Sequence, residues 1–171
     1  MRILFYIIIC FVFCYPARTQ EIAFSDSLIN EEFFFINQTD LLANGELDVW
    51  GIRFKLGQKE LCDSNDARVL ALASVLHQNS NLIIELGMHM DCRGSKISCV
   101  ALSYGRAKAL RARLIELGIA PERIIAQGYG ESMPYQIEGK TLTCAYINRF
   151  DPRKRAELHA LNRRMTIKIL R

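Results

Sequence analysis

Residues 89–94, HMDCRG, hold the densest set of chemically capable side chains in this sequence. An imidazole, a carboxylate, a thiol and a guanidinium follow one another there, and a further thiol comes at Cys99. Imidazole and thiolate are zinc ligands, so a metal site is the first hypothesis. The segment contains neither a CxxC nor an HxxxH pair, however, and the sequence therefore favours structural cysteines and predicts no metal.

Enzymatic chemistry has little support in the sequence. Ser103 and the three histidines show no triad or HExxH arrangement. Gly128-Tyr129-Gly130, which we expect to form a turn, lacks the third glycine of a dinucleotide-binding loop and opens no predicted helix. The sequence thus predicts neither an enzyme nor a cofactor.

The N-terminus has the pattern of a secretory signal. A basic start is followed by a 13-residue apolar run, residues 3–15, and by a small-residue exit. That run is shorter than the ~18 residues that cross a bilayer, which makes a permanent membrane anchor the weaker alternative. A lipid anchor would need a small residue directly before a cysteine, and neither Cys10 nor Cys14 has one. We expect residues 1–19 to be cleaved from an exported protein.

Export would place the remaining cysteines in an oxidising compartment, where disulfides persist. Four cysteines allow three pairings, and the sequence alone does not choose among them. Cys92 and Cys99 are separated by six residues and can close a short loop, so they are the expected pair. We expect all four of these cysteines to be oxidised, namely Cys62, Cys92, Cys99 and Cys144.

Charge is unevenly distributed along the chain, although the formal net charge of the whole is only +4. Residues 20–90 carry 4 basic and 11 acidic side chains, whereas residues 91–171 carry 16 basic and 7 acidic ones. Two interpretations remain open, complementary faces of one domain or attraction of an anionic polymer. A nucleic acid is not the expected partner, because the protein is predicted to be exported and its Lys and Arg are not interleaved with aromatic residues.

The elements that would position these side chains alternate between strands and helices. An acidic, Phe-rich stretch, residues 20–45, ends at a turn-forming Asn-Gly pair and is expected to pack as an extension of the domain that follows, residues 46–171. Apolar alternation predicts strands, and i, i+3, i+4, i+7 spacing with capping residues predicts helices. In the first half of the domain we expect a strand over 47–56, a helix that begins at Asp63 or Ser64 and ends near 79–81, and a strand over 82–87. A long helix through 107–117, with Gly118 at its C-cap, is expected next, followed by a helical turn at 121–122 and a strand over 124–126. After an irregular stretch over 131–153 we expect a helix over 155–161 and a strand over 165–170.

This β-α-β-α-β-α-β order predicts an α/β (α+β) fold, in which helices pack on a mixed sheet.

Several motifs occur together in this order, namely IIELGMHMDCRGS, LSYGRAKALRARLIELGIAPERIIAQGYGESMP and HALNRRMTIKI. They resemble the OmpA-like peptidoglycan-binding domain, whose pattern runs His-Thr-Asp, Leu-Ser-x-x-Arg-Ala, Gly-Tyr-Gly-Glu-x-x-Pro and Asn-Arg-Arg. The resemblance spans roughly residues 47–170. It implies a non-catalytic periplasmic domain that binds the meso-diaminopimelate side chain of uncrosslinked stem peptides and tethers the outer envelope to the wall, with outer-membrane proteins as possible further partners.

The resemblance also assigns the candidate site. Asp91 and Arg106 match the family's paired positions, and a ligand end with an ammonium and a carboxylate on one carbon requires a fixed anion beside a planar cation. By resemblance Asp91 takes the ammonium and Arg106 takes the carboxylate. Arg163 and Arg164 match the Asn-Arg-Arg motif, and one of them is expected to reach the ligand.

Two ligand-binding positions depart from the family pattern. Met90 stands where the family has Thr, and Cys99 stands where it has Asn, so that a polar arm is lost and the ligand is expected to bind more weakly or to differ. One alternative is a scaffold domain that has kept the fold and lost the ligand. Another is a cell-wall enzyme, which would need a nucleophile or a metal. Arg111, on the same predicted helix as Arg106, is interpreted as structural.

Overall fold

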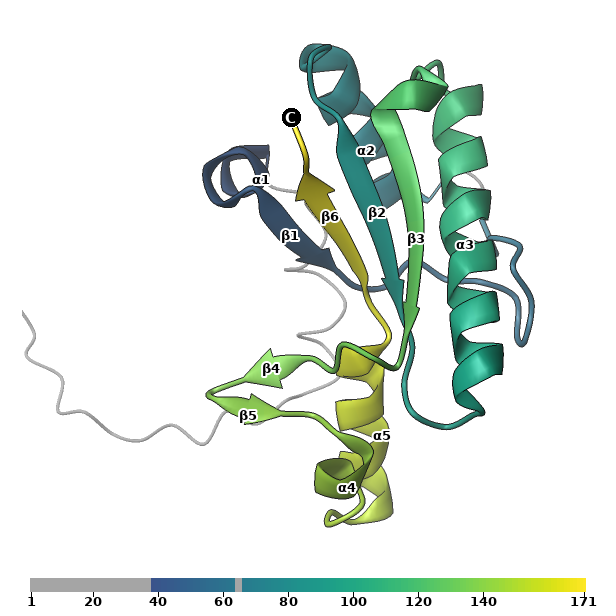
Figure 1. The fold of residues 1–171 in the computed structure, drawn as a ribbon, viewed down its shortest axis with the longest axis vertical. Helices are drawn as coiled ribbons and strands as arrows, with labels where there is room; N and C mark the ends of the chain where they lie inside the picture. The colour runs from purple at the N-terminus through teal and green to yellow at the C-terminus, as the bar shows by residue number, and fades with distance from the viewer. Residues whose placement is uncertain (1–37, 64–65) are drawn as a thin grey trace, which may run out of the picture.

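A computed structural model describes residues 38–63 and 66–171 of the chain (Figure 1). The predicted signal, residues 1–19, lies outside the described residues, as does the predicted extension up to residue 37. The helices and strands, in chain order, are α1 (Gln38–Asn44), β1 (Glu46–Val49), α2 (Ala67–Gln78), β2 (Ile84–His89), α3 (Lys96–Glu116), the 3-10 helix η1 (Pro121–Arg123), β3 (Ile124–Gly130), β4 (Gln136–Ile137), β5 (Lys140–Thr141), α4 (Cys144–Ile147), α5 (Pro152–Asn162) and β6 (Met165–Ile169).

The main sheet has four strands in the order β1-β6-β2-β3. β2 and β3 pair in parallel, and β6 runs antiparallel to both β1 and β2. α2 and α3 pack against this sheet, whereas the β4–β5 hairpin, α4 and α5 lie beyond the end where β2 and β3 stop (Figure 1). The predicted fold class, a mixed sheet with helices packed on it, is confirmed.

The core forms where alternate strand residues meet the apolar stripes of α2 and α3. The predicted apolar stripe of α2 (Val69, Leu72, Ala73 and Leu76) is buried, and so is that of α3 (Ala107, Leu110 and Leu114) except for Leu117, which is partly buried. Every second residue of β2 from Ile84 and the first three residues of β6 are buried as well. Leu41 of α1 is fully buried in the same cluster, so the core also takes in the helix just before β1. The other members at its centre are Val69, Leu72, Ala73, Leu76, Ile84, Leu86, Met88, Ala107, Leu110, Leu114, Met165 and Ile167.

Capping residues set the ends of the helices that flank the candidate site. Asp66 is the N-cap of α2 and accepts a hydrogen bond from the backbone N–H of Arg68, so this helix begins a few residues later than predicted. Ser95 caps α3 in the same way, which starts the helix directly after the HMDCRG segment. Gly118, with a φ of +92°, follows α3 as predicted for its C-terminal end.

Two predicted elements are corrected by the structure. The strand expected over residues 47–56 ends at Val49, and Gly51, with a φ of +86°, lies in the chain that leaves the sheet. The stretch expected to be irregular, residues 131–153, contains β4, β5 and α4.

The Gly-Tyr-Gly motif does not form the expected turn, because it is the end of strand β3. Gly128 lies against α3 so closely that a Cβ atom there would overlap the backbone N and Cα of Tyr104. Gly128 is therefore needed for close packing of β3 on α3 and not for a turn.

Candidate functional site

Asp91 lies just beyond the carboxyl end of β2, where the chain leaves the sheet for α3. The register between β2 and β3 shifts at His89, and the backbone N–H of Met90 still donates to the Gly130 carbonyl oxygen at 2.7 Å. The next residue, Asp91, leaves the strand pairing with its side chain only 8% exposed. The paired ends of β2 and β3 thus hold the carboxylate in one place.

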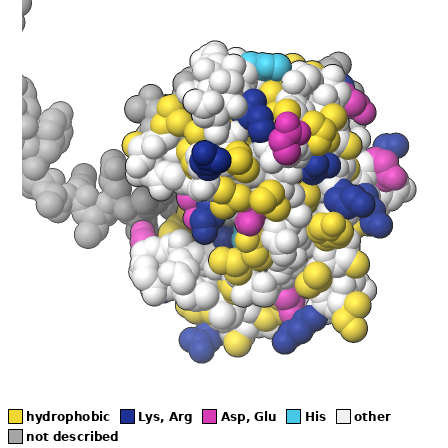
Figure 2. Space-filling view, turned by 45° about the horizontal axis from the view of Figure 1, so that its top comes forward, with side chains coloured by type: hydrophobic (Ala, Val, Ile, Leu, Met, Phe, Trp, Pro, Cys, Tyr) yellow, Lys and Arg dark blue, Asp and Glu magenta, His cyan; other side chains and the backbone are white. Residues whose placement is uncertain are grey.

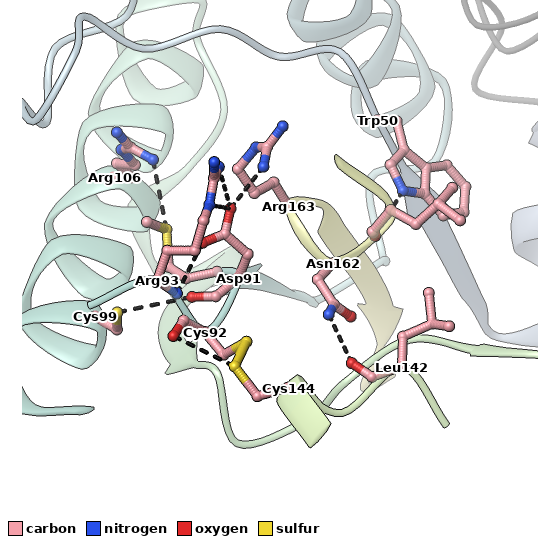
Figure 3. Close-up of polar contacts among 12 residues, drawn as sticks. Trp50, Asp91, Cys92, Arg93, Cys99, Arg106, Leu142, Cys144, Asn162 and Arg163 are labelled. Atoms are coloured by element: carbon pink, nitrogen blue, oxygen red, sulfur yellow. Dashed lines mark hydrogen bonds and ion pairs between the residues drawn. A yellow bond between two sulfur atoms is a disulfide. The ribbon is translucent and has the colours of Figure 1, made fainter. Parts of the chain in front are cut away.

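Two arginines hold the carboxylate of Asp91 (Figure 3). Its Oδ2 accepts from Nη2 of Arg93 at 2.7 Å, from Nε of Arg93 at 3.2 Å and from Nη1 of Arg163 at 2.6 Å. Its Oδ1 accepts from the backbone N–H of Arg93 at 3.1 Å. Burial raises the pKa of Asp91, but these hydrogen bonds outweigh burial and hold the pKa at about 2, so the side chain is an anion at neutral pH.

Arg106 comes from α3 and makes no ion pair with Asp91. Its Nε donates to the Gln58 carbonyl oxygen at 3.1 Å, its Nη1 lies 3.4 Å from the Met90 sulfur, and its guanidinium lies 5.0 Å from the centre of the Phe54 ring. Burial lowers the pKa of Arg106, and the positive charge of Arg163 lowers it further. The arginine therefore holds the chain between β1 and α2 against α3 and still carries a charge that no acidic side chain in the described part of the protein neutralises.

The two arginines of the Asn-Arg-Arg motif lie in different surroundings. Arg163 is the C-cap of α5 and points to Asp91, with its side chain 39% exposed. Arg164 is 8% exposed, donates to Asp48 at 2.7 Å and lies 5.2 Å from the centre of the Tyr135 ring. Of the two predicted candidates, Arg163 meets Asp91, and Arg164 braces β1 against the chain before β4.

Met90 and Cys99 also lie close to Asp91, but in different ways. The Met90 sulfur lies against Arg106, whereas Cys99 is buried in the first turn of α3, with its sulfur 3.9 Å from the Asp91 carbonyl oxygen. Burial raises the pKa of the Cys99 thiol, and Glu131 and Asp91 raise it further. Met90 thus lines the site, and Cys99 contacts the backbone of Asp91.

The expected disulfide pairing is wrong, and so is the expectation that all four cysteines are oxidised. Cys92 is bonded to Cys144, with 5.9 Å between their Cα atoms, while Cys99 is a buried free thiol and Cys62 an exposed one. The Cys92 side chain leaves the loop toward α4, whereas Cys99 is already part of α3 and packs inward. The bond ties the loop that contains Asp91 to the segment before α5.

A groove with a volume of ≈ 1630 Å³ runs past these residues between the chain after β1, the β4–β5 hairpin and α5. Trp50 forms part of its wall, where Nε1 donates to the Leu161 carbonyl oxygen at 3.0 Å and the indole meets Tyr135 edge-on at 5.3 Å. Basic residues outnumber acidic ones along the groove. The basic ones are Arg53, Arg93, Arg106, Lys140, Lys154, Arg163 and Arg164, and the acidic ones are Asp91, Glu138 and Glu157.

One face of the molecule is mixed in charge (Figure 2). On the face shown in Figure 2, Lys and Arg are interspersed with Asp and Glu and with hydrophobic side chains. The uneven charge along the sequence therefore does not separate into one basic and one acidic patch on that face, whereas the lining of the groove has more basic than acidic residues.

Arg93 is the site residue that the sequence-based prediction missed. Its only signal was its place two residues after Asp91, which lets both its backbone and its side chain reach the same carboxylate. Within residues 38–63 and 66–171, no group of three His, Cys, Asp or Glu side chains is arranged to hold a metal ion, and no helix is long and apolar enough to span a membrane.

A model of the OmpA family matches residues 53–143, which include both Asp91 and Arg106. The chain belongs to the OmpA family. This membership bears out the resemblance seen in the sequence and places the chain among non-enzymatic binding and structural domains, as predicted.

Outer membrane porin F of Pseudomonas fluorescens is 34% identical to this OmpA-family chain over 89 residues. The match spans 52% of the chain but only 26% of the porin, so the chain corresponds to about a quarter of that protein.

Solved structures share the fold at low sequence identity. The peptidoglycan-associated lipoprotein of Burkholderia pseudomallei is 22% identical, with 71% of this chain and 88% of that one covered and a TM-score of 0.52. A MotB-like protein of Desulfovibrio vulgaris is 19% identical, with 77% and 85% covered and a TM-score of 0.55. The periplasmic domain of Helicobacter pylori MotB is 15% identical, with 72% and 74% covered and a TM-score of 0.53. Two of these relatives are named for the bacterial envelope, one as an outer membrane porin and one as a periplasmic domain.

Proposed function

We propose that this chain binds peptidoglycan without cleaving it and holds the diaminopimelate end of an uncrosslinked stem peptide between Asp91 and Arg106. The observation that carries the proposal is the open groove, in which a fixed carboxylate and a guanidinium without an acidic partner among the described residues lie at the two positions that the family pattern pairs. A zwitterionic ligand end would offer an ammonium to the carboxylate of Asp91 and a carboxylate to the guanidinium of Arg106.

The geometry leaves room for such a ligand at both residues. Oδ1 of Asp91 accepts one backbone N–H and no side-chain donor among the described residues, so it can accept an ammonium proton. Nη2 of Arg106 makes no hydrogen bond within the same part of the chain and can donate to a carboxylate. The positive charge of Arg163, which pairs with Asp91, also lowers the pKa of Arg106, so the surroundings of Arg106 favour an anionic group.

Binding of this kind fits a protein that links the outer envelope to the wall. Its relatives in the outer membrane and periplasm, and the leader predicted over residues 1–19, support export to the periplasm. In that setting the domain attaches whatever carries it, an outer-membrane protein included, to the peptidoglycan layer.

A scaffold that has lost the ligand is the second candidate, and one observation favours it. Arg93 and Arg163 already satisfy Oδ2 of Asp91, and Met90 offers no hydroxyl beside it. Sedimentation with isolated peptidoglycan separates the two functions, because the scaffold stays in the supernatant.

Asp91→Asn and Arg106→Ala should each abolish sedimentation. Removing one partner of a desolvated charge pair costs ~2 to 5 kcal/mol of binding, or roughly 30-fold and more. Circular dichroism verifies that each variant is folded. Two folded variants that sediment like the wild type would refute the proposal.

Arg153→Ala is the matched control, because its side chain is 84% exposed and is not among the residues that line the groove, although it lies 3.8 Å from the lining residue Glu157. Arg111 is unsuitable, since its guanidinium donates to the carbonyl oxygens of Ile124 at 2.8 Å and Pro121 at 2.7 Å. That contact agrees with the structural role expected for Arg111 and makes its removal a change in the fold.

A further inference from the structure

Three guanidinium groups line the part of the groove that contains Asp91, and two of them contact its carboxylate. Arg93 and Arg163 share Asp91, so two positive charges face one negative charge. Arg106 adds a third, and its contacts in the described part of the chain are to a carbonyl oxygen, a thioether and an aromatic ring. This end of the groove therefore carries an excess of positive charge that one zwitterion, whose own charges cancel, does not neutralise.

Arg93 and Arg163 are also the exposed members of the cluster. Their side chains are 58% and 39% exposed, against 8% for Asp91 beneath them. In Figure 3 their guanidinium groups lie side by side on the same side of the Asp91 carboxylate. Nη1 of Arg93 and both Nε and Nη2 of Arg163 make no hydrogen bond to the described residues, so these donors are open to a ligand.

A carboxylate suits this pair of guanidinium groups for two reasons. Planar guanidinium groups donate two parallel hydrogen bonds to a carboxylate, and an anion beside both relieves their mutual repulsion. Asp91 fixes the two arginines before any ligand arrives, which lowers the entropic cost of binding.

We propose that Arg93 and Arg163 form a second carboxylate site, which selects stem peptides whose glutamyl carboxylate, next to diaminopimelate, is free instead of amidated. The inference rests on the proposed function, because it adds a second contact to the same ligand. Arg93 is then a specificity-determining residue, and the family's paired positions alone do not account for ligand choice.

The test is calorimetric titration of the full exported chain with two soluble stem peptides. Both contain meso-diaminopimelate, and they differ only in whether the preceding glutamyl residue carries a carboxylate or a carboxamide. The wild type should bind the free acid about tenfold more tightly, as expected for one charge-assisted contact. Arg93→Ala should bind the two peptides with similar affinity, close to that of the wild type for the amide.

Each alternative outcome has a defined meaning. Equal binding of the two peptides by the wild type, or a preference retained in Arg93→Ala, would overturn the second carboxylate site and leave the proposed function standing. Failure of the wild type to bind either peptide would overturn both.

Two further variants guard against a folding effect. Arg93→Lys keeps the positive charge but loses the paired donors, so a reduced preference for the free acid is expected. Arg153→Ala, the exposed control, should keep the full preference. Loss of preference in Arg153→Ala would mean that overall charge, and not the second carboxylate site, selects the ligand.

Discussion

Removing the Cys92–Cys144 disulfide is expected to destabilise the protein and loosen its candidate site. The bond joins residues 52 positions apart in the sequence. Cross-linking a loop of that length lowers the conformational entropy of the unfolded chain by an amount worth about 4 kcal/mol at 25 °C. Cys92→Ser combined with Cys144→Ser should therefore lower the free energy of unfolding by about 4 kcal/mol.

The effect should be concentrated at the end of the molecule that holds the groove. The segment around α4 and α5 packs on a small separate cluster of Leu142, Ile147 and Leu158, whereas the sheet, α2 and α3 share the large core. With so little buried apolar surface, the α4 segment depends on its covalent link to the Asp91 loop. We expect the double variant to keep the large core and to bind peptidoglycan more weakly.

Equilibrium urea unfolding measures the loss with two probes. Trp50 is the single tryptophan and donates to α5, so its fluorescence reports on the groove, while far-UV circular dichroism reports on all helices. The fluorescence transition of the double variant should come at lower urea than its dichroism transition.

Two results would refute this reasoning. One is a decrease in unfolding free energy below about 1 kcal/mol, well under the loop-entropy value. The other is a peptide map of the unreduced wild type that shows Cys92 bonded to Cys99. Cys62→Ser, which removes an exposed free thiol, is the control and should match the wild type.

Two further predictions concern single residues. Because hydrogen bonds hold the pKa of Asp91 at about 2, below its ordinary 3.8, this carboxylate stabilises the fold above about pH 4 and the contribution disappears as the pH falls toward 2. Asp91→Asn should lack that acid-dependent part of the unfolding free energy, about 2 kcal/mol, in urea titrations from pH 6 to 2, and a variant with the wild-type pH profile would contradict the hydrogen-bond network. Gly128→Ala should lower the unfolding free energy by about 1 to 3 kcal/mol, since the new methyl group overlaps the backbone of Tyr104, and an unchanged urea midpoint would speak against such close packing.

The sequence by itself determined the order of the four main strands and of α2, α3 and α5, and most of the large core, but not α1, β4, β5 or α4. Period-3.6 stripes such as Leu72 with Leu76 and Leu110 with Leu114 are buried as predicted, because a helix in water hides its apolar face whatever it packs against. The family and the carboxylate at Asp91 could likewise be recognised from local motifs, since those residues are few, adjacent and in a set order.

Tertiary structure alone decided which distant groups meet. Cys144 reaches Cys92, and Arg163 reaches Asp91, only because α4 and α5 lie beyond the end of β2 in the folded chain. No local spacing encodes contacts between residues that are 52 or 72 positions apart. The same applies to Gly128, whose sequence suggests a turn but whose neighbour in space is α3. Local propensity acts over a few residues, whereas pairing, packing and charge balance at the site depend on residues that meet only in the folded chain.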